Sequence, residues 1–81
     1  MRISTTAGKY RYYLRGKGTA WTLEMWWRNP DGEGWYAEDF DLDYDKRHRR
    51  LFLSDRAEKR VGVAGIAALE RLSRRALGER G

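Results

Sequence analysis

Hydrophobic and polar residues alternate through the first half of the chain, which is typical of strands with one buried face. Three stretches show this pattern: residues 9–15, 19–28 and 35–44. Turn-forming residues separate the stretches, with Gly16-Lys17-Gly18 after the first and residues 29–34, rich in Pro, Asp and Gly, after the second. The pattern predicts a meander of three antiparallel strands, to which residues 49–53 can add a short fourth.

The last third of the chain changes to a helical period. At about 100° per residue, the small and aliphatic residues between positions 61 and 76 fall in one stripe, and the arginines lie outside it. Asp55 followed by Glu58 is typical of a helix N-cap, and Gly78 stands where a C-terminal cap belongs. Gly62 and Gly65 each cost about 1 kcal/mol relative to alanine, so we expect the helix to begin near residue 61 or to bend there.

Together these elements predict an α+β fold, an antiparallel sheet of three to four strands in a meander with one C-terminal helix packed on one face. The 81 residues fit a single small domain, 1–81, and we expect its ends, residues 1–8 and 78–81, to be flexible. The predicted core combines inward side chains of the strands with the helical stripe: Trp21, Leu23, Trp27, Phe40, Leu42, Ile66, Leu69 and Leu72.

The chain lacks the residues that most enzyme mechanisms require. There is no cysteine and only one histidine, His48, which leaves no Cys- or His-based metal set and no Ser-His-Asp triad. The alternating aspartates of residues 39–43 resemble a calcium loop only superficially, because Tyr44 and Arg50 stand where that loop requires Gly and Glu. We therefore expect no enzyme activity, cofactor, metal or small-molecule substrate.

The sequence also bears on location. The longest weakly apolar run, residues 61–69, is far shorter than the roughly 20 residues that span a bilayer, so we expect no membrane association. The lack of cysteine favours a cytoplasmic location.

Charge is divided into blocks along the chain. Residues 1–30 carry six basic and one acidic side chain, residues 31–45 seven acidic and no basic ones, and residues 46–81 eleven basic and four acidic ones. Unless the blocks pair with one another, the folded chain should have distinct positive and negative surfaces. The net charge of +5 favours nucleic acid, a nucleoprotein complex or another acidic partner.

Aromatic residues are the second unusual feature. Four Trp and five Tyr exceed the needs of one sheet–helix interface, so some rings must be exposed unless Arg and Lys stems cover them. Such rings beside arginine can stack on nucleobases, or form the hot spots of a protein interface. The predicted partner-binding residues are Arg47, Arg49, Arg50, Trp26, Tyr13, Arg11 and Arg15.

An acidic row offers an alternative contact surface. Alternate residues of a strand lie about 7 Å apart, close to the spacing of phosphates along a nucleic-acid strand, so the row could imitate a nucleic-acid backbone. It could equally be neutralised across a hairpin by the basic residues of positions 46–50. The acidic row consists of Asp39, Asp41, Asp43 and Asp45.

In its size, its meander-plus-helix outline and its separation of acidic residues 39–45 from basic residues 47–50, the chain resembles the small inhibitors carried by phages and other mobile elements, including anti-CRISPR proteins. The resemblance rests on no motif and assigns no residue. It implies a protein that binds a nucleoprotein defence complex and interferes with its nucleic-acid binding. The sequence thus favours a non-enzymatic interaction protein with a protein or nucleoprotein partner, and the alternative is a domain that binds nucleic acid directly.

Overall fold

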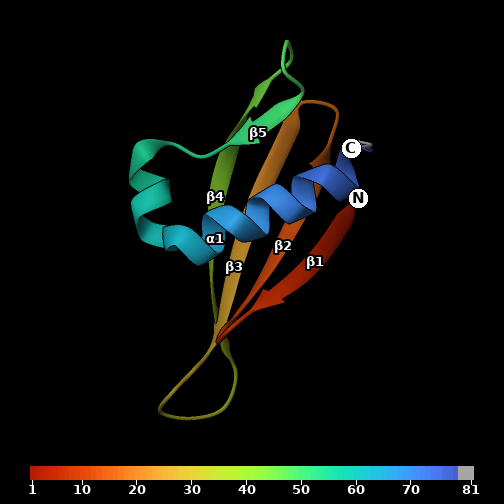
Figure 1. The fold of residues 1–81 in the computed structure, drawn as a ribbon. Coiled ribbons are helices and arrows are strands. Elements are labelled where there is room, and N and C mark those ends of the chain that lie inside the picture. The colour runs from red at the N-terminus through yellow and green to blue at the C-terminus, as the bar shows by residue number, and fades with distance from the viewer. Residues whose placement is uncertain (79–81) are drawn as a thin grey trace.

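The computed structural model describes residues 1–78, which form a five-stranded antiparallel sheet and one helix. The strands follow one another across the sheet in chain order, β1 to β5, and the helix lies across one face (Figure 1). The α+β class, the meander and the C-terminal helix are confirmed, but the sheet has five strands where three to four were predicted. The elements are β1 (Arg2–Ala7), β2 (Tyr10–Lys17), β3 (Ala20–Arg28), β4 (Trp35–Asp45), β5 (Arg50–Phe52) and α1 (Asp55–Ala76).

The additional strand is β1, formed by residues that the sequence predicts to be flexible. Arg2–Ala7 pairs with β2 along its full length, and the backbone N–H of Gly16 donates to the carbonyl of Met1. Ile3 and Ala7 pack partly buried against the core, but Thr5 interrupts their apolar pattern, which hides the strand in the sequence. At the other end, Gly78 is part of the turn after α1, and the expectation for residues 79–81 lies outside the described residues.

The β2–β3 hairpin turns later than the glycines indicate. β2 continues through Gly16 to Lys17, which pairs with Ala20, so the turn is Gly18-Thr19. Gly16 has a φ of 151°, and a Cβ atom there would collide with the backbone carbonyl of Ala20. Gly16 therefore lets β2 and β3 approach each other closely and is not part of the turn itself.

The core lies between α1 and the face of the sheet that it crosses (Figure 1). Trp27 and Ile66, which the sequence predicts for the core, are only partly buried, because Trp27 sits near the end of β3 beside Tyr36 and Ile66 lines a hollow next to β5. The buried apolar residues are Tyr12, Leu14, Trp21, Leu23, Met25, Phe40, Leu42, Leu51, Leu53, Val61, Ala68, Leu69 and Leu72.

The N-cap of α1 is Ser54, whereas the sequence predicts Asp55. Ser54 has extended backbone angles, and its hydroxyl accepts a hydrogen bond of 3.2 Å from the backbone N–H of Ala57. Asp55 falls in the first helical turn, where its negative charge favours the helix dipole. The helix found among residues 1–78 is not apolar enough to cross a lipid bilayer.

Gly62 bends α1, which confirms the bend predicted from the glycines at positions 62 and 65. Its φ of 71° and ψ of −174° belong to a region that is essentially restricted to glycine. The bend lets the first two turns reach β4, where the Nε atom of Arg60 donates to Glu38 Oε1 at 3.0 Å. The longer part then continues across the sheet towards β1 (Figure 1).

Gly62→Ala should lower the free energy of unfolding by about 1–3 kcal/mol, although alanine is the best helix former. A Cβ atom at Gly62 would meet no other atom within 4 Å, so the whole effect would come from backbone strain. Chemical denaturation measures it, and Ala64→Gly, on the exposed regular helix, is the control with an expected loss of about 1 kcal/mol. An increase in stability for Gly62→Ala would show that α1 is continuous.

Candidate functional site

The face of the sheet opposite α1 is its outer face, and within residues 1–78 no helix covers it. The strand register places Arg11 opposite Trp26, and Trp26 opposite Ala37. Tyr12, between Arg11 and Tyr13, is fully buried, which directs its two neighbours outward. The outer-face residues of β2, β3 and the first half of β4 are Arg11, Tyr13, Arg15, Thr22, Glu24, Trp26, Arg28, Trp35, Ala37, Asp39 and Asp41.

A buried carboxylate, Glu24, stands at the centre of the outer face and is only 4% exposed. Arg2 donates to it twice, from Nε to Oε2 at 3.2 Å and from Nη2 to Oε1 at 2.9 Å. Arg15 Nη1 adds a bond of 2.7 Å to Oε2, and the indole N–H of Trp26 a bond of 2.8 Å to Oε1. Hydrogen bonds from Arg2, with those from Arg15 and Trp26, lower the pKa of Glu24 from 4.5 to about 2 despite desolvation, which opposes the shift.

The Glu24 cluster also fixes the neighbouring aromatic rings. The guanidinium carbon of Arg2 lies 3.8 Å from the ring centroid of Tyr13, and the rings of Tyr13 and Trp26 meet edge to face at 6.1 Å. Both rings are only partly exposed. The indole of Trp26 is thus held from its nitrogen by Glu24 and along its edge by Tyr13, which gives it a defined orientation.

Next to these rings lies a shallow hollow of about 130 Å³, lined by Arg11, Tyr13, Trp26 and Trp35, which we call the aromatic pocket. Two guanidinium groups approach the Trp35 ring, with Arg11 Cζ at 5.5 Å and Arg28 Cζ at 5.3 Å from its centroid. Trp35 is 42% exposed. The aromatic pocket therefore combines planar rings with cations that have no acidic partner within the described residues.

The structure divides the predicted partner-binding set into two groups. Arg11, Tyr13, Arg15 and Trp26 lie together on the outer face, but the basic run lies at the β4–β5 turn. Trp26 is opposite Ala37, and Asp45 at the turn lies eight positions after Ala37, about 26 Å along the strand. The predicted partner-binding residues therefore do not form one surface, because the length of β4 separates Arg47, Arg49 and Arg50 from Trp26 and Tyr13.

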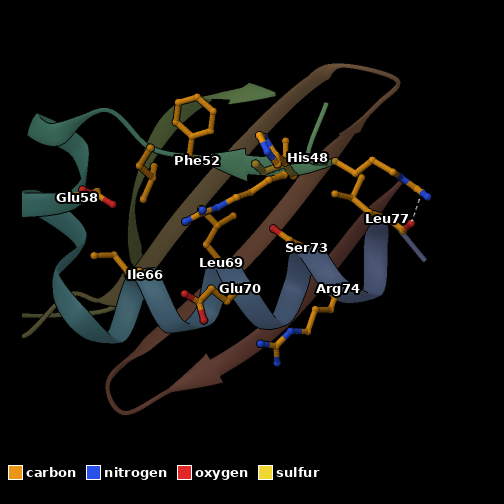
Figure 2. Close-up of a pocket in the computed structure, with 13 residues that line it drawn as sticks. His48, Phe52, Glu58, Ile66, Leu69, Glu70, Ser73, Arg74 and Leu77 are labelled. Carbon is orange, nitrogen blue, oxygen red and sulfur yellow. Dashed lines mark hydrogen bonds between the residues drawn. The ribbon is translucent and has the colours of Figure 1, made fainter. Parts of the chain in front are cut away.

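Arg49 connects the β4–β5 turn to the end of α1. Its backbone has a φ of 50°, and its Nη2 atom donates to the carbonyl of Leu77 at 2.9 Å, which ties the turn to the end of α1. Figure 2 shows this bond beside a hollow of about 320 Å³ between β5 and α1. Acidic Glu58 and Glu70 line the hollow together with Arg50 and Arg74, so it presents no charge of a single sign.

The acidic row follows β4 along the outer face, as predicted. Among residues 1–78, an ion pair of 3.4 Å joins Asp39 to Arg15, and His48 Nδ1 lies within hydrogen-bond distance of Asp45 Oδ2, at 2.6 Å. The side-chain hydrogen bond with His48 lowers the pKa of Asp45 most, and Asp45 Oδ1 also accepts backbone N–H bonds from Arg47 and His48. Within the same range, no ion pair joins the row to the arginines of positions 47–50, so the hairpin neutralisation that the sequence left open is not observed.

Three residues of the site were not predicted from the sequence: Glu24, Arg28 and Trp35. Glu24 could have been found from the sequence, because a two-residue turn at Gly18-Thr19 places it opposite Tyr13 and diagonal to Arg15. Arg2 could not be found, because its strand was not recognised. No cluster of acidic or histidine side chains within residues 1–78 has the composition of a metal site.

Comparison of the chain with protein-family models, with curated proteins and with solved structures gave no match.

Proposed function

We propose that this protein is a non-enzymatic binding domain, which recognises a protein or nucleoprotein partner with the outer face of its sheet. The observation that carries the proposal is the aromatic pocket, where Arg11, Trp26 and Trp35 gather on a face that no helix covers in the described chain. Trp, Tyr and Arg are the residues that contribute most to the energy of protein interfaces.

The order of this surface supports the proposal. The Glu24 cluster fixes Arg2, Arg15 and Trp26 before any partner arrives, so that binding loses less side-chain entropy. A buried ion pair is often no more stabilising than apolar residues of the same volume. Its presence on the outer face therefore favours a role in positioning the rings over a role in folding alone.

The charge of the surface indicates the class of partner. Arg11 and Arg28 beside Trp35 form a cationic site, which suits an acidic protein surface or a nucleoprotein complex. The resemblance to phage and mobile-element inhibitors of the anti-CRISPR type points the same way, because those proteins bind nucleoprotein complexes. In this proposal the protein occupies the partner's surface and interferes with its nucleic-acid binding.

Direct nucleic-acid binding is the second candidate function, and the same pocket favours it. Trp35 offers a ring on which a base can stack, and Arg11 and Arg28 lie close enough to bind the adjoining phosphates. Such binding would weaken steeply with salt because counterions are released.

Affinity purification from cells of the source organism tests the proposal. Arg11→Glu with Trp35→Ala should remove the partner bound by the wild type, before and after nuclease treatment, and leave the thermal melt unchanged. Lys17→Glu is the matched control, since Lys17 is an exposed cation at the end of β2, away from the aromatic pocket. Equal recovery with the double variant would refute the role of the outer face.

Titration of fluorescent single-stranded DNA and RNA of roughly 20 nucleotides separates the two candidates. The interaction proposal predicts weak binding at about 150 mM salt. Submicromolar binding that falls with salt, and is lost in Arg11→Glu with Trp35→Ala, would establish direct nucleic-acid binding instead.

A further inference from the structure

The edge of β4 is mostly unpaired. All of Trp35–Leu42 pairs with β3 on one side, but β5 pairs only with Asp43, Tyr44 and Asp45 on the other. Figure 1 shows β5 beside one end of β4, with the rest of the strand extending beyond it. Every second residue of a strand directs its N–H and C=O groups to a given side, so residues 35–42 present free donors and acceptors along this edge.

A groove runs along the open edge. It has a volume of about 540 Å³ and lies between β4 and the beginning of α1. No other segment of the described chain bonds to the β4 backbone there. Its lining residues are Glu38, Asp39, Phe40, Asp41, Ser54, Arg56, Ala57 and Arg60.

Arg56 and Arg60 line the groove from the α1 side, where Arg60 pairs with Glu38, but the outer-face side of the edge carries only acidic charge, which selects an occupant. A strand added to β4 would place its own outer-face side chains about 5 Å from Asp39 and Asp41, with Asp43 continuing the row. Asp41 and Asp43 have no ion-pair partner within residues 1–78. Lys or Arg opposite Asp39 and Asp41 would pair with these carboxylates, and the cation opposite Asp41 would also lie diagonal to Asp43, whose own edge is occupied by β5. A second copy of β4 would bring two acidic rows together.

We propose that the open edge of β4 binds an extended basic segment of a partner protein by strand addition. Main-chain hydrogen bonds to residues 35–42 supply the general affinity, and the acidic row selects cations at every second position of the segment. The groove shares no lining residue with the aromatic pocket, and only Trp35, at the end of the open edge, belongs to both surfaces. The proposal therefore goes beyond the proposed function and can stand without it.

The probe is a fluorescent peptide in which Lys or Arg alternates with Val or Thr over about eight residues, the length of the open edge. We expect a dissociation constant of about 10–100 µM at about 100 mM salt. Asp41→Lys with Asp43→Lys should weaken binding at least about tenfold and leave the thermal melt unchanged. Asp31→Lys with Glu33→Lys, in the exposed β3–β4 loop, makes the same change in net charge and should retain most of the affinity.

Backbone methylation of the peptide distinguishes strand addition from simple attraction of charges. N-methyl groups at alternate residues block one edge of the peptide, so one of the two possible patterns should abolish binding and the other should retain it. Equal binding of both methylated peptides, or equal loss in both lysine variants, would overturn the proposal. Concentration-dependent dimers of the wild type that the basic peptide does not dissociate would replace it with pairing of two β4 edges.

The two proposals fail in different experiments. Arg11→Glu alone should leave the affinity for the peptide within about twofold, because Arg11 lies on β2, away from the open edge, and does not line the groove. A loss of peptide binding in that variant would place the peptide on the outer face and overturn the assignment to the edge.

Discussion

Leu72→Ala should lower the free energy of unfolding by about 3–4 kcal/mol, the largest effect that we expect from a single truncation of the helix. Leu72 is completely buried where α1 packs on the sheet, and removing its side chain leaves a cavity that the surrounding strands cannot close. A domain of this size has a total stability of about 4–12 kcal/mol, so the variant would lose a large share of it.

Urea denaturation at neutral pH measures this loss. Arg71→Ala is the matched control, because Arg71 precedes Leu72 on the exposed side of the same helical turn and should change stability by about 0.5 kcal/mol or less. If both variants were equally stable, the face of α1 that packs on the sheet would be assigned wrongly.

Glu24→Gln should lower the free energy of unfolding by about 2–3 kcal/mol at neutral pH. The amide keeps the shape of the side chain but loses its charge, and its NH₂ group would face donors of Arg2, Arg15 or Trp26. Arg2 and Arg15 are half exposed and can return to water, which limits the loss.

The pH dependence of stability identifies the carboxylate as the cause. The pKa of Glu24 is about 2 in the folded protein, below its ordinary 4.5, so its contribution is complete above about pH 4.5 and disappears as the pH falls through about 2. The difference in stability between the wild type and Glu24→Gln should shrink over that interval. A constant difference from neutral pH to about pH 2 would contradict the assigned pKa.

The fold could largely be predicted, because alternation and period report burial. The strands at residues 19–28 and 35–44 combine apolar and polar residues strictly enough to fix their faces. β1 could not be found, since its inward position Thr5 is polar and an edge strand needs only a weak apolar pattern. The N-cap was misplaced by one residue because Ser54 and Asp55 are both good capping residues.

The candidate site could be predicted only in part. Parity along a strand is enough to place Trp26, Tyr13 and the two arginines of β2 on one face. The types of the residues do not show how far apart they lie along a strand. The basic residues of positions 47–50 lie about 26 Å from Trp26 along β4. Contacts such as that of Arg2 with Glu24, 22 positions apart, depend on the pairing of strands and require the fold.

The four tryptophans permit the most direct test of the central claim that the outer face binds the partner. Trp26 and Trp35 lie on the outer face, whereas Trp21 and Trp27 lie on the face crossed by α1. The measurement is the ¹⁵N-resolved indole NMR spectrum of the protein with and without its purified partner. We expect the indole signals of Trp26 and Trp35 to shift or broaden while those of Trp21 and Trp27 stay in place. Changes confined to Trp21 and Trp27 would refute binding at the outer face.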